Sequence, residues 1–465
     1  MRKLLTCLLL ITNCFASERI HVPWSLEGAD ARIREYRMGT ETFQIELPNG
    51  EPLPKGVVCS VTQVKHAFNF GGSLAADWKV PEREWYPSFK EKFARLFNYA
   101  TIDFYWAVHE KKRGQWKYNK DSREKLDWAN SLGMRLRGHP LMWHEVLPSW
   151  MTDSERSVEA MDADIARHVK RLLEDFPEIH EWDVYNEAPG IKWRPKDEGI
   201  RRWHEATGGA AKVSERMLKT ARAIRPDADY ILNHYTDLDV EFKEQIQHCL
   251  DNATDFEAIG IQTHMHTVMD TLNEERLWDA LENYSLFGKP IHLSEISILS
   301  CETFADYDSF NAWKNSIDSA VKNGKTPPLL KSTKEYEAYQ AGLAHDFYTL
   351  AFSHPSVDAI IWWTITDLEP WRGMPAGLLD ANGNSKPVYD VLDQLINDQW
   401  KTRFISSSVA DGRLEVEGFY GQYELELEYK GTQFLGYFDL DKSNASTLKI
   451  KLIEKPLNEI LSSTF

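Results

Sequence analysis

Between residues 65 and 400, short β-rich runs alternate with helical patterns, and this alternation restricts the fold more than any other feature of the chain. Helical spacing of apolar residues separates the runs, for example in 162–176 and in 276–288, where Gly288 marks a helix end. The eight candidate strands are 67–74, 99–106, 135–143, 181–187, 230–236, 258–264, 291–298 and 359–367. Strands separated by helices form parallel βα units, and eight such units close into a barrel. The sequence therefore predicts an α/β protein built on a (β/α)8 TIM barrel.

The segments on either side of this pattern are rich in β signals. Residues 41–63 combine polar–apolar alternation with Pro and Gly turns. Residues 413–431 alternate strictly, so that one face is apolar and the other carries glutamates. We expect a small N-terminal β lead-in over 18–64, the barrel over 65–400 and a small C-terminal β module over 401–465. Packing against the barrel is the expected role of the module, and sugar binding is the alternative.

Residues 1–17 have the pattern of a secretory signal peptide. Two basic residues precede an apolar run, 4–11, and Ala16 is a small residue of the kind found at a cleavage site. The run is too short to cross a bilayer, and no later segment approaches that length. A lipoprotein with Cys14 as the lipidated residue is the alternative. We expect a protein that is secreted (extracellular or periplasmic) and makes no membrane contact after signal removal.

Charge and composition restrict the binding partners and the kinds of site that we expect. The formal net charge is −17, which argues against nucleic acid as a partner, since a polyanion needs a basic surface. The 17 Trp residues are many for this length, and Trp often serves as a flat stacking surface. Beyond the signal, Cys59, Cys249 and Cys301 are too few and too scattered for a disulfide framework or a zinc site.

Chemically active residues gather at the C-terminal ends of the predicted strands, where the active site of a TIM barrel lies. Glu187 and Glu295 end the fourth and the seventh strand, so that they face each other across the barrel mouth. Two carboxylates, one protonated and one ionised, are the minimal apparatus of glycoside hydrolysis. Paired glutamates can also bind a metal, but the histidines here lack the close spacing of a ligand triad. The hydrolase interpretation is favoured, and it requires no cofactor and no metal.

Four of these strand ends resemble the signature strands of glycoside hydrolase family 10, the endo-β-1,4-xylanases. The matching stretches are RGHPLMWHEVLPSW (137–150), WDVYNE (182–187), IGIQTH (259–264) and LSEISI (293–298). Residues 363–392 are similar to the family's eighth strand, the loop after it and the closing helix. The flanks, RIREYRM (32–38) and GFYGQYELELEYKG (418–431), resemble those of plant-type members. The resemblance covers about residues 65–400.

The resemblance implies roles for the two glutamates and their neighbours. Glu187 would be the general acid/base, and Asn186 would hold the 2-hydroxyl of the sugar at the bond being cut. Glu295 would be the nucleophile and would form a glycosyl-enzyme that water resolves with retention. His264 would hydrogen-bond Glu295, with Gln262 beside it.

The same resemblance implies a set of residues that line the sugar. His139 and Trp143 would lie on the glycone side of the cleaved bond, although a core role for His139 is the alternative. Trp363 and Trp371 would wall the cleft and stack on the sugar. Stacking needs no charge, so that it suits a neutral polymer bound by an acidic protein.

Two strands depart from the family pattern. The family's second strand has a Glu-Asn pair and then a Lys that bind two glycone sugars, and this chain has Thr101, Ile102 and Tyr105 at those positions. Tyr105 is still expected to contact the substrate, and Asp103 could rebuild part of the lost network. Ser297 stands where the family has an Asp that orients the histidine beside the nucleophile. The catalytic pair is retained, while the identity of the sugar is left open.

These observations predict a retaining endo-glycosidase that hydrolyses internal β-bonds of a plant or algal polysaccharide by double displacement. β-1,4-Xylan or a substituted xylan is the first candidate, another β-glycan the second, and a non-catalytic glycan-binding barrel the third. The basic loop 191–203 is either a solvated cluster or a contact for an acidic decoration of the glycan. The sequence does not decide between endo and exo action, nor does it indicate the oligomeric state.

Overall fold

The computed structural model describes most of the chain. The described residues are 26–74, 84–117, 120–235, 239–408, 410–442 and 448–455. The predicted signal peptide, residues 1–17, lies outside them. None of the helices in these ranges is long and apolar enough to span a membrane.

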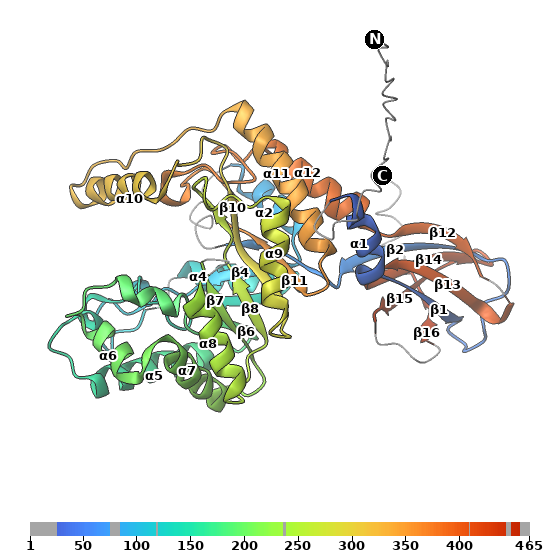
Figure 1. Ribbon diagram of the computed structural model, residues 1–465. Coiled ribbons are helices and arrows are strands. Elements are labelled where there is room, and N and C mark those ends of the chain that lie inside the picture. Colours follow the sequence, from blue (N-terminus) through green and yellow to red (C-terminus); the bar gives the residue numbers. More distant parts are fainter. Residues whose placement is uncertain are drawn as a thin grey trace, which may run out of the picture.

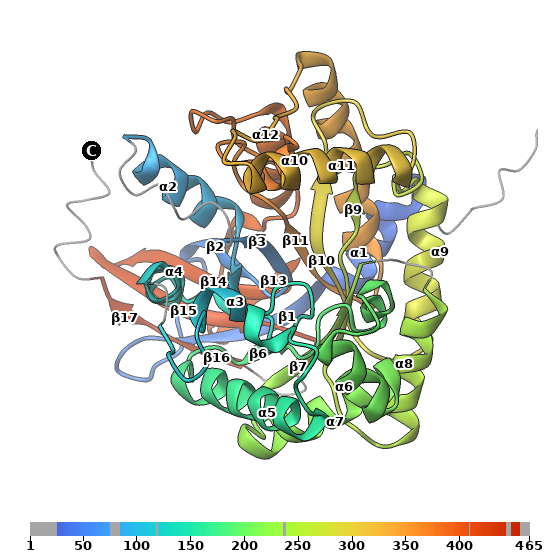
Figure 2. The ribbon, with the colours of Figure 1, turned by 90° about the vertical axis from the view of Figure 1, so that its left-hand side faces the viewer.

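Eight parallel strands form a closed barrel within the described part of the chain. They are β3 (Asn69–Ser73), β4 (Tyr99–Asp103), β5 (Arg135–His139), β6 (Glu181–Asp183), β7 (Asp229–His234), β8 (Ala258–Ile261), β10 (Ile291–Ile298) and β11 (Val357–Trp362). Each strand pairs with the next, and β11 pairs with both β10 and β3, which closes the ring. A short strand, β9 (His264–Met265), extends the pairing along the end of β10. Figure 2 shows the strands surrounded by helices. The predicted (β/α)8 fold is confirmed.

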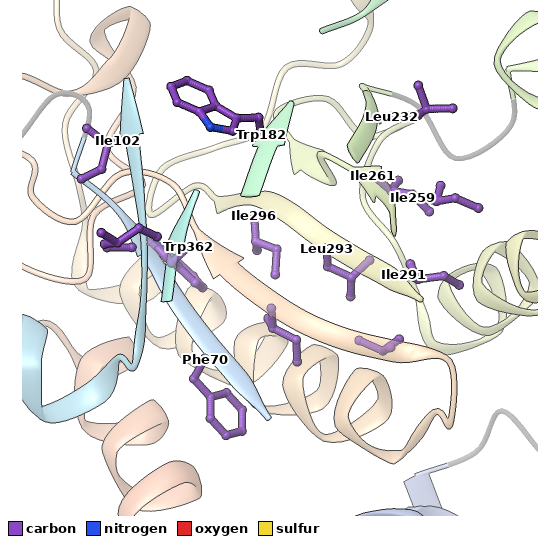
Figure 3. Packing of buried hydrophobic residues seen from close by; sticks show 14 of the residues in the cluster. Phe70, Ile102, Trp182, Leu232, Ile259, Ile261, Ile291, Leu293, Ile296 and Trp362 are labelled. Carbon is purple, nitrogen blue, oxygen red and sulfur yellow. The ribbon is translucent and has the colours of Figure 1, made fainter. Parts of the chain in front are cut away.

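The main hydrophobic core lies between the barrel strands and the outer helices. Figure 3 shows strand residues such as Phe70, Ile102, Trp182 and Leu232 in this cluster, and all four are buried. The outer helices are α2 (Tyr86–Leu96), α4 (Lys120–Ser131), α5 (Val158–Asp175), α7 (Gly209–Ile224), α8 (Val240–Asp251), α9 (Glu274–Ser285), α11 (Lys334–Ser353) and α12 (Pro387–Gln394).

The sequence explains these helices through their caps and apolar stripes. In α5, Ser157 precedes the helix and its side chain accepts a hydrogen bond from the backbone of Ala160, which satisfies a free amide of the first turn. Met161, Ile165 and Val169 then recur at a spacing of four and are buried against the barrel. The predicted helix 162–176 ends within one residue of the end of α5, while α5 begins four residues earlier than predicted.

The two flanks of the barrel combine into one β-sandwich, although the sequence analysis treated them as separate units. The three-stranded sheet has the order β13 (Arg413–Phe419), β1 (Met38–Glu46), β16 (Leu448–Lys451). The five-stranded sheet has the order β12 (Arg403–Ser407), β2 (Val58–His66), β14 (Gly421–Tyr429), β15 (Thr432–Leu440), β17 (Ile453–Glu454). Apolar residues of both sheets, including Phe43, Val61, Val416 and Leu425, share one core. N-terminal strands therefore lie inside both sheets of the C-terminal module.

The sandwich packs against the end of the barrel where the strands begin (Figure 1). Arg37, the last residue of α1 (Ala29–Arg37), donates hydrogen bonds to the carbonyls of Phe352, His354 and Val357, between α11 and the start of β11. Phe419 of β13 belongs to the barrel core. A cavity of about 500 Å³ lies at this junction. The opposite end of the barrel is left open for a site.

A further helix, α10 (Tyr307–Lys322), projects from the end of the molecule opposite the sandwich (Figure 1). It lies in the polar segment that follows β10. Asp306 and Ser309 form a capping box at its start, and none of its residues is fully buried. Figure 2 shows the helix in front of the barrel, on the side that faces the viewer.

Candidate active site

Glu187 lies four residues beyond the end of β6, which is shorter than the predicted strand 181–187. Backbone hydrogen bonds nevertheless continue the sheet: Asn186 donates to the carbonyl of Met142 over 2.8 Å and Glu187 donates to that of Asn233 over 2.9 Å. Glu187 itself has a left-handed backbone, with φ 57°. This conformation is uncommon for a residue with a side chain and often marks a functional turn.

Two donors hold the carboxyl group of Glu187. The indole Nε1 of Trp143 lies 3.0 Å from Oε2, and the amide Nε2 of Gln262 lies 2.7 Å from Oε1. Burial raises the pKa of Glu187 to about 7, and the negative charge of Glu295 adds to this effect, which outweighs the two hydrogen bonds. Glu187 is therefore protonated up to about neutral pH, as a general acid must be.

Glu295 lies inside β10, and it is 5% exposed. Its Oε1 accepts a hydrogen bond of 2.9 Å from Asn233 Nδ2, and its Oε2 lies 3.3 Å from His264 Nε2. Burial alone would raise the pKa of Glu295, but the charge of His139 and the contact with His264 outweigh it and lower the pKa below its usual value. The two glutamates thus differ in charge between the lowered pKa of Glu295 and a pH of about 7.

Asn233 connects the two halves of the site. Its Nδ2 donates both to Asn186 Oδ1, over 2.8 Å, and to Glu295 Oε1, while its Oδ1 accepts from Ser294 Oγ over 2.7 Å. Asn186 Nδ2 is buried and has no hydrogen-bond partner among the described residues. The sequence analysis did not single out Asn233, although a polar residue in an otherwise apolar strand pattern was a usable signal.

His264 continues into a short chain of polar contacts. Its Nδ1 lies 2.8 Å from Ser297 Oγ, and the same oxygen lies 2.8 Å from His266 Nε2. Burial lowers the pKa of His266 far below its usual value, so that this ring is neutral. Ser297 can therefore accept from His266 and donate to His264, which leaves the His264 Nε2 proton directed at Glu295.

His139 belongs to a buried charged group on the other side of Glu295. Its Nδ1 lies 2.7 Å from Asp183 Oδ2 and 4.0 Å from Glu295 Oε1. Arg137 also donates to Asp183, through Nε over 3.0 Å. Burial alone would lower the pKa of His139, but the charges of Glu295 and Asp183 outweigh it and raise the pKa. The sequence analysis missed Arg137 and Asp183. Arg137 lies two residues before the predicted His139, and Asp183 lies three residues before the predicted Asn186.

Aromatic rings surround these polar groups. Tyr105 lies 6.0 Å from the ring of His139 and 5.8 Å from that of Trp143, measured between ring centroids. The ring of Trp363 lies 5.5 Å from His139, and Trp371 stacks on His264 at 4.8 Å. All the predicted site residues are therefore joined to one or the other glutamate through direct or single intermediate contacts.

Two more aromatic residues, which the sequence analysis did not single out, lie near Glu187. Trp193 is 75% exposed at the end of the short helix that follows Glu187. Its Nε1 donates to the hydroxyl of Tyr235 over 3.4 Å. Such an exposed Trp beside polar groups is a candidate stacking surface for a sugar.

The structure corrects the interpretation of the second strand. Ile102 was placed among the glycone-binding positions, but it faces the outer helices and is fully buried in the main core. Successive residues of a strand point to opposite faces, so that Thr101 and Ile102 cannot both face a ligand. The hydroxyl of Thr101 is buried without a hydrogen-bond partner in the described residues. Asp103 forms an ion pair of 2.6 Å with Lys125 of α4.

The basic loop after Glu187 is largely neutralised by its own neighbours. Lys192 lies 3.2 Å from Glu241, Arg194 lies 2.9 Å from Glu198 and Arg201 lies 2.6 Å from Glu205; these distances are between side-chain nitrogen and oxygen atoms. Of the two interpretations of this loop, a solvated cluster is the one that fits these pairs. Across the described ranges, no group of His, Cys, Asp and Glu side chains is arranged to hold a metal ion.

Two carboxyl groups with opposite charge preferences, at the C-terminal end of a (β/α)8 barrel and flanked by aromatic rings, define the class of glycoside hydrolases. The family model of glycosyl hydrolase family 10 matches residues 62–394. The chain belongs to this family, and it is a glycoside hydrolase of the retaining, endo-xylanase-like type.

Several proteins of known name, and a solved structure, are similar to this chain. The chain is 26% identical to endo-1,4-beta-xylanase B of Thermotoga neapolitana over 371 residues, which are 76% of this chain and 94% of that protein. It is 24% identical to the anti-sigma-I factor RsgI6 of Acetivibrio thermocellus, over 88% of this chain and 47% of that longer protein. The crystal structure of xylanase 10B from Thermotoga petrophila RKU-1 in complex with xylobiose is similar in fold, with a TM-score of 0.56 and 23% identity over 72% of this chain and 95% of that chain.

Proposed function

We propose that this protein is a secreted endo-glycosidase that hydrolyses internal β-1,4 bonds of xylan or a substituted xylan with retention of configuration. The observation that carries the proposal is the opposite shift of the two pKa values, with Glu187 raised to about 7 and Glu295 lowered. A retaining glycosidase needs one protonated and one ionised carboxyl group at the same moment.

In the first step, a carboxylate oxygen of Glu295 attacks the anomeric carbon of the sugar. The proton of Glu187 passes to the glycosidic oxygen, so that the bond to the leaving sugar breaks and a glycosyl ester of Glu295 forms. Asn233 and His264 hold the Glu295 carboxylate in place for the attack through their hydrogen bonds. The unpartnered amide of Asn186 is available to the 2-hydroxyl of the same sugar.

In the second step, the roles of Glu187 are reversed. Its carboxylate accepts a proton from a water molecule, the water oxygen attacks the anomeric carbon, and the ester bond to Glu295 breaks. Two inversions at the same carbon restore the original configuration. Trp143 and Gln262 keep the Glu187 carboxyl group in position through both steps, since each donates to one of its oxygens.

The choice of xylan as substrate rests on the relatives. Several of the similar proteins carry the name endo-1,4-beta-xylanase or beta-1,4-xylanase. The aromatic lining from Trp143, Trp363 and Trp371 suits a neutral sugar chain, which offers flat apolar faces and no charge. Export is proposed from the signal pattern of residues 1–17.

A second candidate substrate is a different β-glycan. The observation that favours it is the glycone side, where Tyr105 presents a phenol ring beside His139 and Ile102 faces away from the site. A glycone subsite with fewer polar contacts would tolerate a sugar whose hydroxyl groups are arranged differently.

One assay tests both candidates. New reducing ends are measured after incubation with linear xylan, acid-substituted xylan and β-glucan, for the wild type and for Glu295→Ala. The proposal expects release from a xylan that falls at least about a thousandfold in the variant, because the nucleophile is lost. Release from β-glucan alone supports the second candidate, and binding without turnover of any polymer contradicts the hydrolase proposal.

A further inference from the structure

Two cations near the catalytic residues have no ion-pair partner among the described residues. Lys314 of α10 lies 5.4 Å from the centroid of the Phe310 ring, and the guanidinium of Arg372 lies 4.8 Å from that of the Trp371 ring. Neither side chain forms an ion pair or a hydrogen bond within the part of the chain that the structure describes. Both are only partly exposed.

The fold fixes both cations relative to the catalytic residues. The indole Nε1 of Trp313, next to Lys314 in α10, donates to the backbone carbonyl of Arg372 over 2.8 Å. Arg372 directly follows Trp371, which stacks on His264, the neighbour of Glu295. A second contact joins α10 to the site, because Phe310 lies 5.5 Å from His266. The helix and the 371–373 segment therefore form one packed unit above the site.

The electrostatics show that the two cations share one environment. Burial lowers the pKa of Lys314, and the positive charge of Arg372 lowers it further. Burial also lowers the pKa of Arg372, which the negative charge of Glu187 partly restores. Glu145 and Asp318 act on both cations in the same direction as Glu187. Two like charges held together and partly dehydrated are costly, unless an anion binds between them.

Arg372 is also held at a backbone cost. Its φ of 53° lies in the left-handed region, where Gly or Asn is favoured over a long side chain. The following residue, Gly373, also has a positive φ, and a Cβ there would meet the carbonyl of Pro328 at 2.6 Å. Residues kept in such conformations cluster at ligand-binding positions.

We propose that Lys314 and Arg372 bind a carboxylate on the glycan, namely a uronic acid branch on the sugar whose glycosidic oxygen Glu187 protonates, or on the next sugar of the chain. Arg offers a planar pair of donors that matches a carboxylate, and Lys adds a mobile charge. The inference rests on the proposed function, because it adds a substituent to the xylan substrate. It also explains how a protein of net charge −17 accepts an acidic polymer.

The test compares a xylan that carries glucuronic acid branches with the same polymer after its carboxyl groups are reduced to alcohols. The variants are Lys314→Met, Arg372→Gln and their combination. The control is Lys322→Met, which removes an exposed charge from the last turn of the same helix. Because all single variants change the net charge equally, long-range electrostatics are matched.

We expect the wild type to show a kcat/KM about tenfold higher on the acidic polymer, which is the value of one good charge-assisted hydrogen bond. Each single site variant should lose most of this preference for the acidic polymer, and the double variant should lose all of it, mainly because KM on the acidic polymer rises. Lys322→Met should keep the preference. Equal rates of the wild type on both polymers, or a preference that survives in the double variant, would overturn the inference.

A binding experiment separates failure of this inference from failure of the proposed function. Glu295→Ala is titrated calorimetrically with a glucuronic-acid-bearing xylo-oligosaccharide and with its neutral parent. Tighter binding of the acidic compound, lost on adding Arg372→Gln, supports the anion site even if the wild type cleaves no xylan. Equal binding of both compounds rejects the site even if xylan is cleaved. A sulfated xylan as a third ligand tests whether the site selects carboxylate over another anion.

Discussion

At the scale of single residues, the charge difference between the two glutamates follows from their neighbours. Glu187 is bound by the neutral donors of Trp143 and Gln262, which compensate little of the cost of burying a charge. Glu295 faces His139 and His264, which favour its ionised form. In the mechanism that we propose, the same end of the barrel therefore supplies both an acid, Glu187, and a nucleophile, Glu295, and no step uses a metal ion.

This difference predicts a bell-shaped pH profile of kcat/KM. Glu187 must be protonated for the first step, so that the rate falls about tenfold per pH unit above about 7. Glu295 must be ionised, and because its pKa is lowered, the acid limb lies below the usual glutamate range. The measurement is kcat/KM against pH on a soluble xylan.

An activated aryl xyloside is the matched control for that profile. Its leaving group needs no proton, so that glycosylation on this substrate should lose much of the alkaline limb. An alkaline limb that stays the same on both substrates would contradict the assignment of Glu187 as the acid.

The contact of Ser297 with two histidines gives a second prediction. Ser297→Ala removes the hydroxyl that orients His264, so that the Nε2 proton no longer points firmly at Glu295. We expect kcat to fall about tenfold with little change in KM, and the acid limb of the pH profile to move to higher pH. Near-UV circular dichroism checks that the variant keeps the tertiary structure of the wild type. An unchanged acid limb would show that the chain of contacts does not influence Glu295.

Sequence reasoning found the residues that we propose as catalytic more readily than the residues that hold them in place. Glu187, Glu295 and His264 belong to the matching motifs, and the structure brings them together: His264 lies 3.3 Å from Glu295, and the charge of Glu295 raises the pKa of Glu187. Asn233 was missed because its role depends on contacts with Asn186 and Glu295, which are far away in the sequence. Which of two neighbouring strand residues faces the ligand depends on register, and the sequence does not reveal register.

At the scale of secondary-structure elements, local sequence patterns predicted the features that depend on nearby residues. Apolar periodicity and caps place the helices, as in α5, because each depends on residues within a few positions. The polar segment 299–335 follows β10 and contains α10, for which the sequence analysis predicted no helix. Its capping box is visible at Asp306, but the helix has no buried apolar stripe, which is the usual helical signal.

The attachment of α1 to the barrel gives an element-scale prediction. The Arg37 side chain serves three carbonyls at the α11–β11 turn. Arg37→Met removes all three of these hydrogen bonds, and we expect the free energy of unfolding to fall by about 3 kcal/mol. Denaturant titration measures it. Arg34→Met, at an exposed position of the same helix, is the control and should change stability by less than about 0.5 kcal/mol. Equal effects of the two variants would contradict a structural role for the Arg37 contacts.

At the scale of the whole molecule, the sequence predicted the barrel but not how its flanks are joined. Eight alternating units leave few topologies, since parallel strands need helical crossovers. Strand partners in the sandwich are free of that constraint: β1 pairs with β13 across almost the entire chain. Alternation alone predicts that a strand exists and says nothing about its partner.

The shared sandwich predicts that its two parts cannot be separated. Deletion of residues 401–465 removes β12 to β17, so that β1 and β2 lose their partners and expose unpaired edges and the apolar residues Phe43 and Val61. We expect at least about tenfold less soluble protein than for the full chain, with the remainder unfolding at lower temperature in a calorimetric scan. A soluble truncated protein with the unfolding midpoint of the full chain would contradict this expectation.

The central claim, that Glu295 forms a glycosyl ester while Glu187 supplies the proton, is tested most directly by trapping the ester. The protein is incubated with a fluorinated, activated xylobioside, whose glycosyl-enzyme hydrolyses slowly, and is then measured by intact mass and peptide mapping. The account predicts one added disaccharide unit on the peptide that contains Glu295, and none in Glu295→Ala. An adduct on another residue, or turnover of xylan without any trapped adduct, would contradict it.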